Sequence, residues 1–231
     1  MWTMYHSVAQ KYGLTRTYSR KAGYGASWLD RSVIFSWFAY LIFSLAVKEK
    51  DTLYDFSAGE TILDYIGDYV GLMGQLSYAV LGVALLFTII YIANEYRNRH
   101  RISIPKNLYV FSILLLYSIF LYDFVVGYIV FAFSHGIEYI AFVNKYVEKK
   151  YRQCPLSSSI LALASRKLWA YSGLFSLVII SLCLIGMNSD KGWFTTYIVG
   201  SSFLHFLYDG WIWKMRKPSV GKPLDIKYAS T

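Results

Sequence analysis

Cysteine and proline are scarce in this sequence, which has only two cysteines and four prolines in 231 residues. Cys154 lies in a basic segment beside Pro155, whereas Cys183 lies inside an apolar run, so the two are not expected to meet and no disulfide framework is implied. Charged residues are also few, at 16%, whereas 56% of the residues are apolar and 19% are aromatic. A single water-soluble core is therefore not expected.

Signature motifs of several enzyme classes are missing as well. The sequence has no Gly-x-Ser-x-Gly elbow, no phosphate loop ending in Gly-Lys-Ser/Thr, no His-Glu-x-x-His and no Cys-x-x-Cys. Residues 1–27 lack an apolar core of about 7 to 15 residues before a small-residue cleavage site, so a cleavable signal peptide is not expected.

What the sequence does contain is a series of long apolar stretches typical of membrane-spanning helices. They cover residues 32–47, 70–93, 108–122, 127–147, 168–187 and 194–213. The sequence predicts an all-α polytopic transmembrane bundle of about six spans, forming a single integral membrane domain over residues 1–231.

The third and fourth spans are separated only if the chain turns sharply near Asp123, because residues 108–144 are apolar almost throughout and too long for one span of about 20 residues. Such a turn places all but three of the 23 lysines and arginines on one side; the three are Lys48, Lys50 and Lys191. Basic residues accumulate on the cytoplasmic side of membrane proteins, which explains the basic excess without a nucleic-acid partner.

This charge bias predicts an integral membrane protein with both termini in the cytoplasm. The expected location is a cell inner membrane, with an organellar membrane as the alternative. Residues 1–27 are then a cytoplasmic N-terminal segment and residues 214–231 a cytoplasmic tail. Residues 48–69 form an external segment that is long enough to lie along the interface. The basic cluster of residues 97–101 is interpreted as a patch that binds lipid headgroups or anchors the chain at the membrane surface.

Four ionisable residues fall inside the predicted hydrocarbon layer, where each costs roughly 2.5 to 3.5 kcal/mol on insertion scales. His135 and Glu138 lie in the fourth span, and His205 and Asp209 lie in the sixth. Each histidine precedes its carboxylate by three or four residues, which places both side chains on one helix face. The four residues are predicted to hold a metal, as a 2-His-1-carboxylate centre or as part of a dinuclear one.

A metal at mid-membrane depth would meet hydrophobic molecules from the bilayer. The first hypothesis is an oxidoreductase that uses iron or another divalent transition metal, acts on a lipid or other hydrophobic substrate and receives electrons from a redox partner. Tyr139 and Tyr208 are the candidate catalytic proton donors. Membrane desaturases and hydroxylases also hold iron on helices, but their several histidine boxes are absent, because the chain has four histidines and no adjacent pair.

Other interpretations of the same residues stay open. His135 and His205 could be the axial ligands of a haem b in an electron-transfer subunit. All four residues could instead form the proton relay of a transporter, or a structural network in an accessory subunit of a membrane complex. Outside this group, Glu95 is expected to pair with Arg97 or Arg99, and both His6 and His100 are expected at the surface.

Overall fold

The described part of the chain is entirely helical. The computed structural model describes residues 2–48 and 69–151, together with residues 172, 173, 177 and 181, and contains no strand among them. The chain divides into two compact units, residues 1–135 and 136–231, and each is described by itself. Four predicted regions lie wholly or mostly outside the described residues: the external segment 48–69, the spans 168–187 and 194–213, and the tail 214–231.

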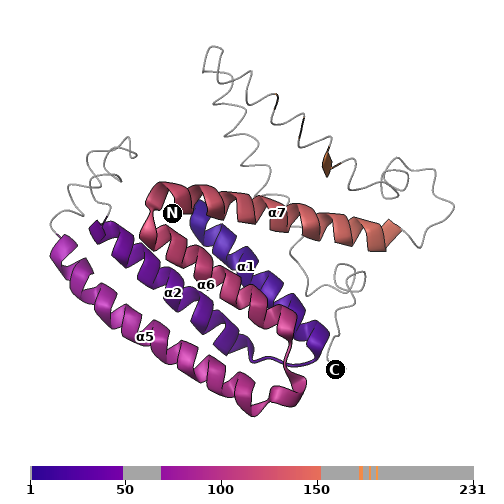
Figure 1. The fold of residues 1–231 in the computed structure, drawn as a ribbon, viewed down its shortest axis with the longest axis horizontal. Coiled ribbons are helices and arrows are strands. Elements are labelled where there is room, and N and C mark those ends of the chain that lie inside the picture. Colours follow the sequence, from indigo (N-terminus) through magenta and orange to yellow (C-terminus); the bar gives the residue numbers. More distant parts are fainter. Residues whose placement is uncertain (1, 49–68, 152–171, 174–176, 178–180, 182–231) are drawn as a thin grey trace. The chain divides into compact units, whose positions relative to one another are not determined.

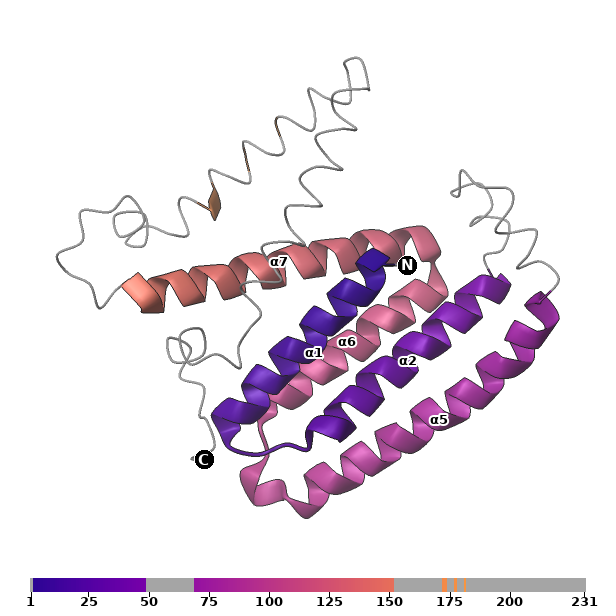
Figure 2. The same cartoon turned by 180° about the vertical axis from the view of Figure 1, so that it is seen from behind.

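The first unit is built of helices, most of which run side by side (Figures 1 and 2). In chain order they are α1 (Trp2–Ala22), α2 (Ser27–Lys48), α5 (Val70–Arg97), the short 3-10 helix η1 (Arg99–Arg101), α6 (Ile104–Tyr122) and the first part of α7 (Phe124–Tyr151). Helix α2 contacts α1, α5 and α6. Because α5 and α6 each pack on α2 more closely than on one another, α2 forms the floor between them.

Four of the described helices are long and apolar enough to cross a membrane. They are Ser27–Lys48, Gly71–Arg97, Ile104–Tyr122 and Phe124–Tyr146, with 19 to 27 residues each. At about 1.5 Å per residue, such helices reach about 28 to 40 Å, compared with about 30 Å for the hydrocarbon core of a bilayer. The prediction of an all-helical chain with transmembrane helices is confirmed to this extent, whereas the six spans and the cytoplasmic termini stay predictions.

Two of these helices begin earlier than the apolar stretches indicated. Helix α2 begins at Ser27 rather than at residue 32, and α6 begins at Ile104 rather than at residue 108. Pro105 lies in the first turn of α6, where its fixed φ suits a helix and its missing N–H is not needed. The earlier starts bring Asp30 and Lys106 into helices, and this determines the site described below.

Asp123 makes the sharp turn between α6 and α7. Its backbone is extended, with φ −143° and ψ 119°, and its Oδ1 accepts a 2.9 Å hydrogen bond from the Val126 N–H in the first turn of α7. An aspartate that caps a helix in this way satisfies an N–H left over at the helix start. The predicted turn near Asp123 is therefore confirmed, and residues 108–144 form parts of two helices rather than one.

Helix α1 was not expected to be part of the bundle, because the sequence indicated only a basic cytoplasmic segment over residues 1–27. It packs on both α2 and α6, and its Val8 lies in the same core cluster as Leu41 and Ile113. The buried face of α1 is otherwise mostly polar and includes Ser7, Gln10, Lys11, Thr15, Thr17 and Ser19. The hydroxyls of Thr15 and Ser19 donate back to carbonyls one turn earlier, which lets α1 bury them.

The far ends of α2 and α6 are tied together by one lysine. Lys48 ends α2 and donates from Nζ to the carbonyl oxygens of Leu121 at 2.7 Å and Tyr122 at 2.9 Å. These carbonyls belong to the last turn of α6 and have no partner within the helix. A lysine at this position also interacts favourably with the negative end of the helix dipole.

The second unit is described over the later part of α7 and four residues beyond it. Asn144 is buried there, and the Ser172 hydroxyl donates a 2.9 Å hydrogen bond to its Oδ1. Lys145 and Glu148 form an exposed ion pair at 3.4 Å, one turn apart on α7. The Ser172–Asn144 hydrogen bond places residue 172 beside α7 within this unit.

Replacing Gly127 by alanine is expected to destabilise the α6–α7 turn. A Cβ at residue 127 would clash with the Phe120 Cα, which is backbone of α6 and cannot rotate away. Overpacking of this kind costs roughly 1 to 3 kcal/mol, so the melting temperature in detergent should fall. Gly82→Ala in α5 is the matched control, because its Cβ meets nothing within 4 Å; an equal loss in both variants would contradict the close approach.

Candidate functional site

Only some of the residues predicted for the metal site lie in the described part of the chain. His135, Glu138 and Tyr139 lie on α7, whereas His205, Tyr208 and Asp209 lie outside the described residues. Among the described residues, no group of three or more histidines, cysteines, aspartates and glutamates could hold a metal ion. The four-residue metal site therefore stays a prediction.

His135 nevertheless lies in polar surroundings within the first unit. The ring of His6 lies against it edge to face, with 5.7 Å between the centroids, and Gln10 donates from Nε2 to the His135 carbonyl at 3.4 Å. Lys11 donates from Nζ to the Ser134 hydroxyl at 2.9 Å. The prediction of a surface position is confirmed for His100 but wrong for His6, which α1 carries into a half-buried position.

A second polar cluster, not predicted from the sequence, lies where α1, α2, α5 and α6 meet. The Lys106 ammonium is 2.5 Å from Glu95 Oε1 and 3.7 Å from Asp30 Oδ1, and its side chain is fully buried. Asp30 also accepts from Arg16 Nη1 at 2.6 Å and from the Ser19 hydroxyl at 3.0 Å. We call Arg16, Asp30, Glu95 and Lys106 the ion network.

The ion network corrects the expected partner of Glu95. This carboxylate was expected to pair with Arg97 or Arg99, but it binds Lys106, because the last turn of α5 lies beside the first turn of α6. The side chains of both arginines are exposed. The sequence indicates that Glu95 needs a cationic partner. It does not indicate which helix end brings that partner.

Charge balance and aromatic rings make burial of Lys106 tolerable. The network contains two cations and two carboxylates, so no buried charge is left uncompensated. The ammonium also lies 5.4 Å from the ring centre of Tyr24 and 5.0 Å from that of Tyr91, close enough for cation–π attraction. Groups from α2, from α5 and from the link between α1 and α2 thus converge on one ammonium.

Tyr24 closes the network from the short link between α1 and α2. Its hydroxyl donates to the Asn94 carbonyl at 3.2 Å and accepts from Asn94 Nδ2 at 2.8 Å. Burial raises the pKa of the Tyr24 hydroxyl, and the nearby Glu95 carboxylate raises it further. Tyr24 therefore stays protonated and able to donate at any physiological pH.

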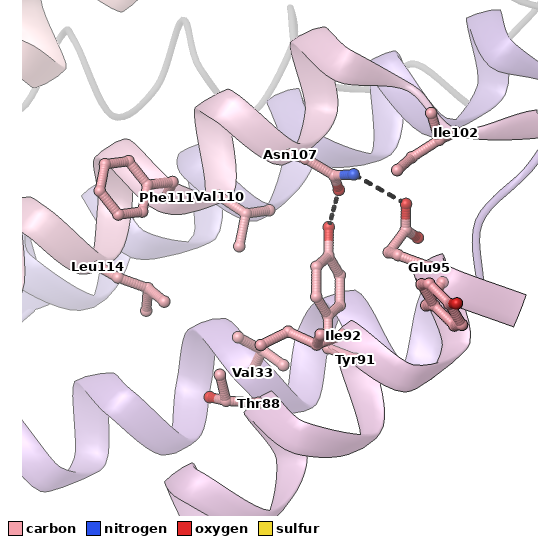
Figure 3. Close-up of a pocket in the computed structure, with 11 residues that line it drawn as sticks. Val33, Thr88, Tyr91, Ile92, Glu95, Ile102, Asn107, Val110, Phe111 and Leu114 are labelled. Atoms are coloured by element: carbon pink, nitrogen blue, oxygen red, sulfur yellow. Dashed lines mark hydrogen bonds between the residues drawn. The ribbon is translucent and has the colours of Figure 1, made fainter. Parts of the chain in front are cut away.

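A pocket of about 480 Å³ adjoins the ion network between α5 and α6 (Figure 3). Its lining residues come from α2, α5 and α6, and from Ile102 between η1 and α6. They are Val33, Thr88, Tyr91, Ile92, Glu95, Tyr96, Ile102, Asn107, Val110, Phe111 and Leu114. Most of these side chains are apolar, and Val33, Tyr91 and Val110 also belong to a small core cluster with Leu29.

The polar groups on the pocket wall bind one another. Asn107 accepts a 2.6 Å hydrogen bond from the Tyr91 hydroxyl and donates from Nδ2 to Glu95 Oε2 at 3.0 Å, as Figure 3 shows. The other oxygen of Glu95 is engaged by Lys106. Because these groups satisfy one another, the surface left for a ligand is apolar.

The pocket opens on the outer surface of the first unit. Ile92, Tyr96 and Phe111 line it and are 61 to 68% exposed. They lie on α5 and α6, two helices of membrane-spanning length.

Comparison with known proteins gives no match. No protein family, no curated protein and no solved structure is detectably similar to the chain.

Sequence reasoning missed Asp30 and Lys106 because each directly flanks an apolar stretch, where a charge is ordinarily a surface group. A signal was present, since Lys106 follows Pro105 at a helix start and so must lie in the first turn of α6. Nothing in the sequence indicates that α1 packs here and brings Arg16 and Ser19 to Asp30.

Replacing Lys106 by methionine is expected to destabilise the protein strongly. The change keeps the length of the side chain but leaves two buried carboxylates without their shared cation, a loss of roughly 3 to 5 kcal/mol. Unfolding in a denaturing detergent would measure it, and adding Glu95→Gln should restore part of the stability. Lys145→Met, which breaks an exposed pair, should cost less than about 1 kcal/mol; equal losses in both would contradict the network.

Proposed function

We propose that this protein is an inner-membrane helix bundle that takes up a hydrophobic, lipid-class molecule from the bilayer into the pocket between α5 and α6. The observation that carries the proposal is the pocket's lateral opening between two helices of membrane-spanning length. In a bilayer such an opening faces lipid rather than water. A hydrophobic molecule could enter it without crossing an aqueous phase.

The size and chemistry of the pocket support a ligand with an apolar body. Its volume of about 480 Å³ falls within the range of roughly 300 to 1,000 Å³ found for ligand sites. A strongly polar ligand would have to break the Tyr91–Asn107–Glu95 hydrogen bonds, and leaving such groups unpaired is costly. An apolar chain can lie beside these groups without breaking their hydrogen bonds.

The floor of the pocket is held in place by neighbouring contacts, which favours a preformed site. Thr88 accepts a 2.8 Å hydrogen bond from the Trp37 indole N–H and donates to the Ala84 carbonyl at 2.8 Å, so α2 and α5 are linked at this level. At the opposite end, Lys106 and Glu95 link α6 to α5. Ligand binding therefore needs little reorganisation of the helices.

A second candidate function is metal-dependent oxidation of a lipid, with His135, Glu138, His205 and Asp209 as ligands and Tyr139 or Tyr208 as proton donor. The observation that favours it is the His6 imidazole beside His135, which would offer a further nitrogen ligand. The Lys11 ammonium, bound to Ser134, adds positive charge nearby, so a divalent ion would need carboxylate ligands as well. Bound iron would supply the oxidising chemistry, and haem between His135 and His205 is the alternative cofactor.

Filling the pocket should remove the bound molecule. Leu114→Trp places a large ring among the lining residues, whereas Leu115→Trp makes the same change at the next position, which is 51% exposed and does not line the pocket. Native mass spectrometry of the purified protein should show lipid-class adducts reduced roughly tenfold in the first variant, since even 1.4 kcal/mol of steric cost has that effect. Unchanged adducts in Leu114→Trp would refute uptake into this pocket.

The metal candidate is tested by elemental analysis and an absorption spectrum. Near-stoichiometric non-haem metal is expected in the wild type, and it should be lost when His135 and His205 are both replaced by alanine. The exposed His100→Ala is the control and should keep its metal. A Soret band would select haem instead, and a wild type free of metal and haem would refute both.

A further inference from the structure

Three arginines lie beside residues that line the pocket, where α5 gives way to α6; we call them the arginine rim. Arg97 is the last residue of α5, and Arg99 and Arg101 are the ends of η1. All three side chains are exposed. The guanidinium of Arg99 lies 5.6 Å from the ring centre of Tyr96, which lines the pocket, and Arg101 directly precedes Ile102, which also lines it.

The positive charge of this arginine rim is not neutralised within the described part of the chain. No described carboxylate pairs with any of its three arginines. The nearest acid in sequence, Glu95, is already bound by Lys106 and Asn107. Three guanidinium groups within five residues therefore remain available for an anion.

The pocket and the arginine rim are arranged in line along the helices. One end of the pocket is formed by Thr88 and Leu114, and the other by Tyr96 and Ile102 beside the rim. Thr88 and Tyr96 are eight residues apart on α5, or about 12 Å at 1.5 Å per residue. Figure 3 shows the same order, with Leu114 and Ile102 at opposite ends. A molecule that fills the pocket thus has its long axis along α5 and its end at the arginines.

We infer that the ligand is an anionic phospholipid, with one acyl chain in the pocket and its phosphate on Arg97, Arg99 and Arg101. This inference rests on the proposed function of the pocket and adds the chemistry of the headgroup. Guanidinium groups bind phosphate oxygens through paired hydrogen bonds. The predicted orientation places the rim at the cytoplasmic leaflet, which is rich in anionic lipids.

The test compares phosphatidylglycerol with phosphatidylcholine carrying the same acyl chains, each titrated into the full-length protein and followed by native mass spectrometry. The wild type should bind phosphatidylglycerol more tightly. Replacing Arg97, Arg99 and Arg101 together by glutamine should weaken that binding roughly 100-fold, at about 1 kcal/mol per arginine. Binding of phosphatidylcholine should hardly change.

The matched control removes three charges elsewhere, through Arg31→Gln, Lys145→Gln and Lys149→Gln. None of these residues lines the pocket, so the preference for phosphatidylglycerol should survive. Loss of the preference in this control would mean that net charge alone attracts the lipid, and would overturn the inference. Equal binding of the two lipids by the wild type would overturn it as well.

Two further outcomes separate this inference from the proposed function. If Leu114→Trp abolishes binding of both lipids while the arginine variant behaves as the wild type, the pocket stands and the headgroup site is overturned. If Leu114→Trp leaves both lipids bound, the pocket itself is refuted. Inorganic phosphate at millimolar concentration should not displace phosphatidylglycerol; displacement would make free phosphate the ligand of the rim and overturn the lipid assignment.

Discussion

The first unit depends on the neutralisation of one ammonium group that water does not reach. Lys106 is fully buried, and its charge is tolerable only because Glu95 and Asp30 approach it from two other helices. Asp30 in turn needs Arg16 and Ser19 from α1. No one of these helices can move without leaving a charge unpaired, so the network sets the register of four helices at once.

The pocket between α5 and α6 also depends on the ion pairs of Lys106. Lys106 joins α6 to α5 at one end, while α2 holds both helices from below through Leu29, Val33, Tyr91 and Val110. Between these contacts α5 and α6 pack on α2 more closely than on each other, which leaves room for a ligand. A charged cluster that fixes the helix ends and an apolar pocket beside it are therefore two results of one arrangement.

The features that could be predicted from the sequence are those fixed by local chemistry. The turn at Asp123 followed from charge bias and from an apolar stretch too long for one span, and the apolar stretches indicated helices of membrane-spanning length. The pairing of Lys106 with Glu95 could not be predicted, because it depends on which helix ends meet. The place of His6 beside His135 was missed for the same reason, since it requires α1 to pack in the bundle. The predicted partners of His135 in the sixth span lie outside the described residues.

Helix α1 has a consequence for the order in which the protein assembles. Its buried face carries hydroxyls, an amide and the Lys11 ammonium, so it cannot partition into lipid by itself as an apolar helix does. Its binding surface is made by α2 and α6, which the chain supplies later. Because α1 precedes α2 and α6 in the chain, its polar face has no partner until both of those helices have formed. Until α1 packs there, Asp30 lacks Arg16 and the ion network is incomplete.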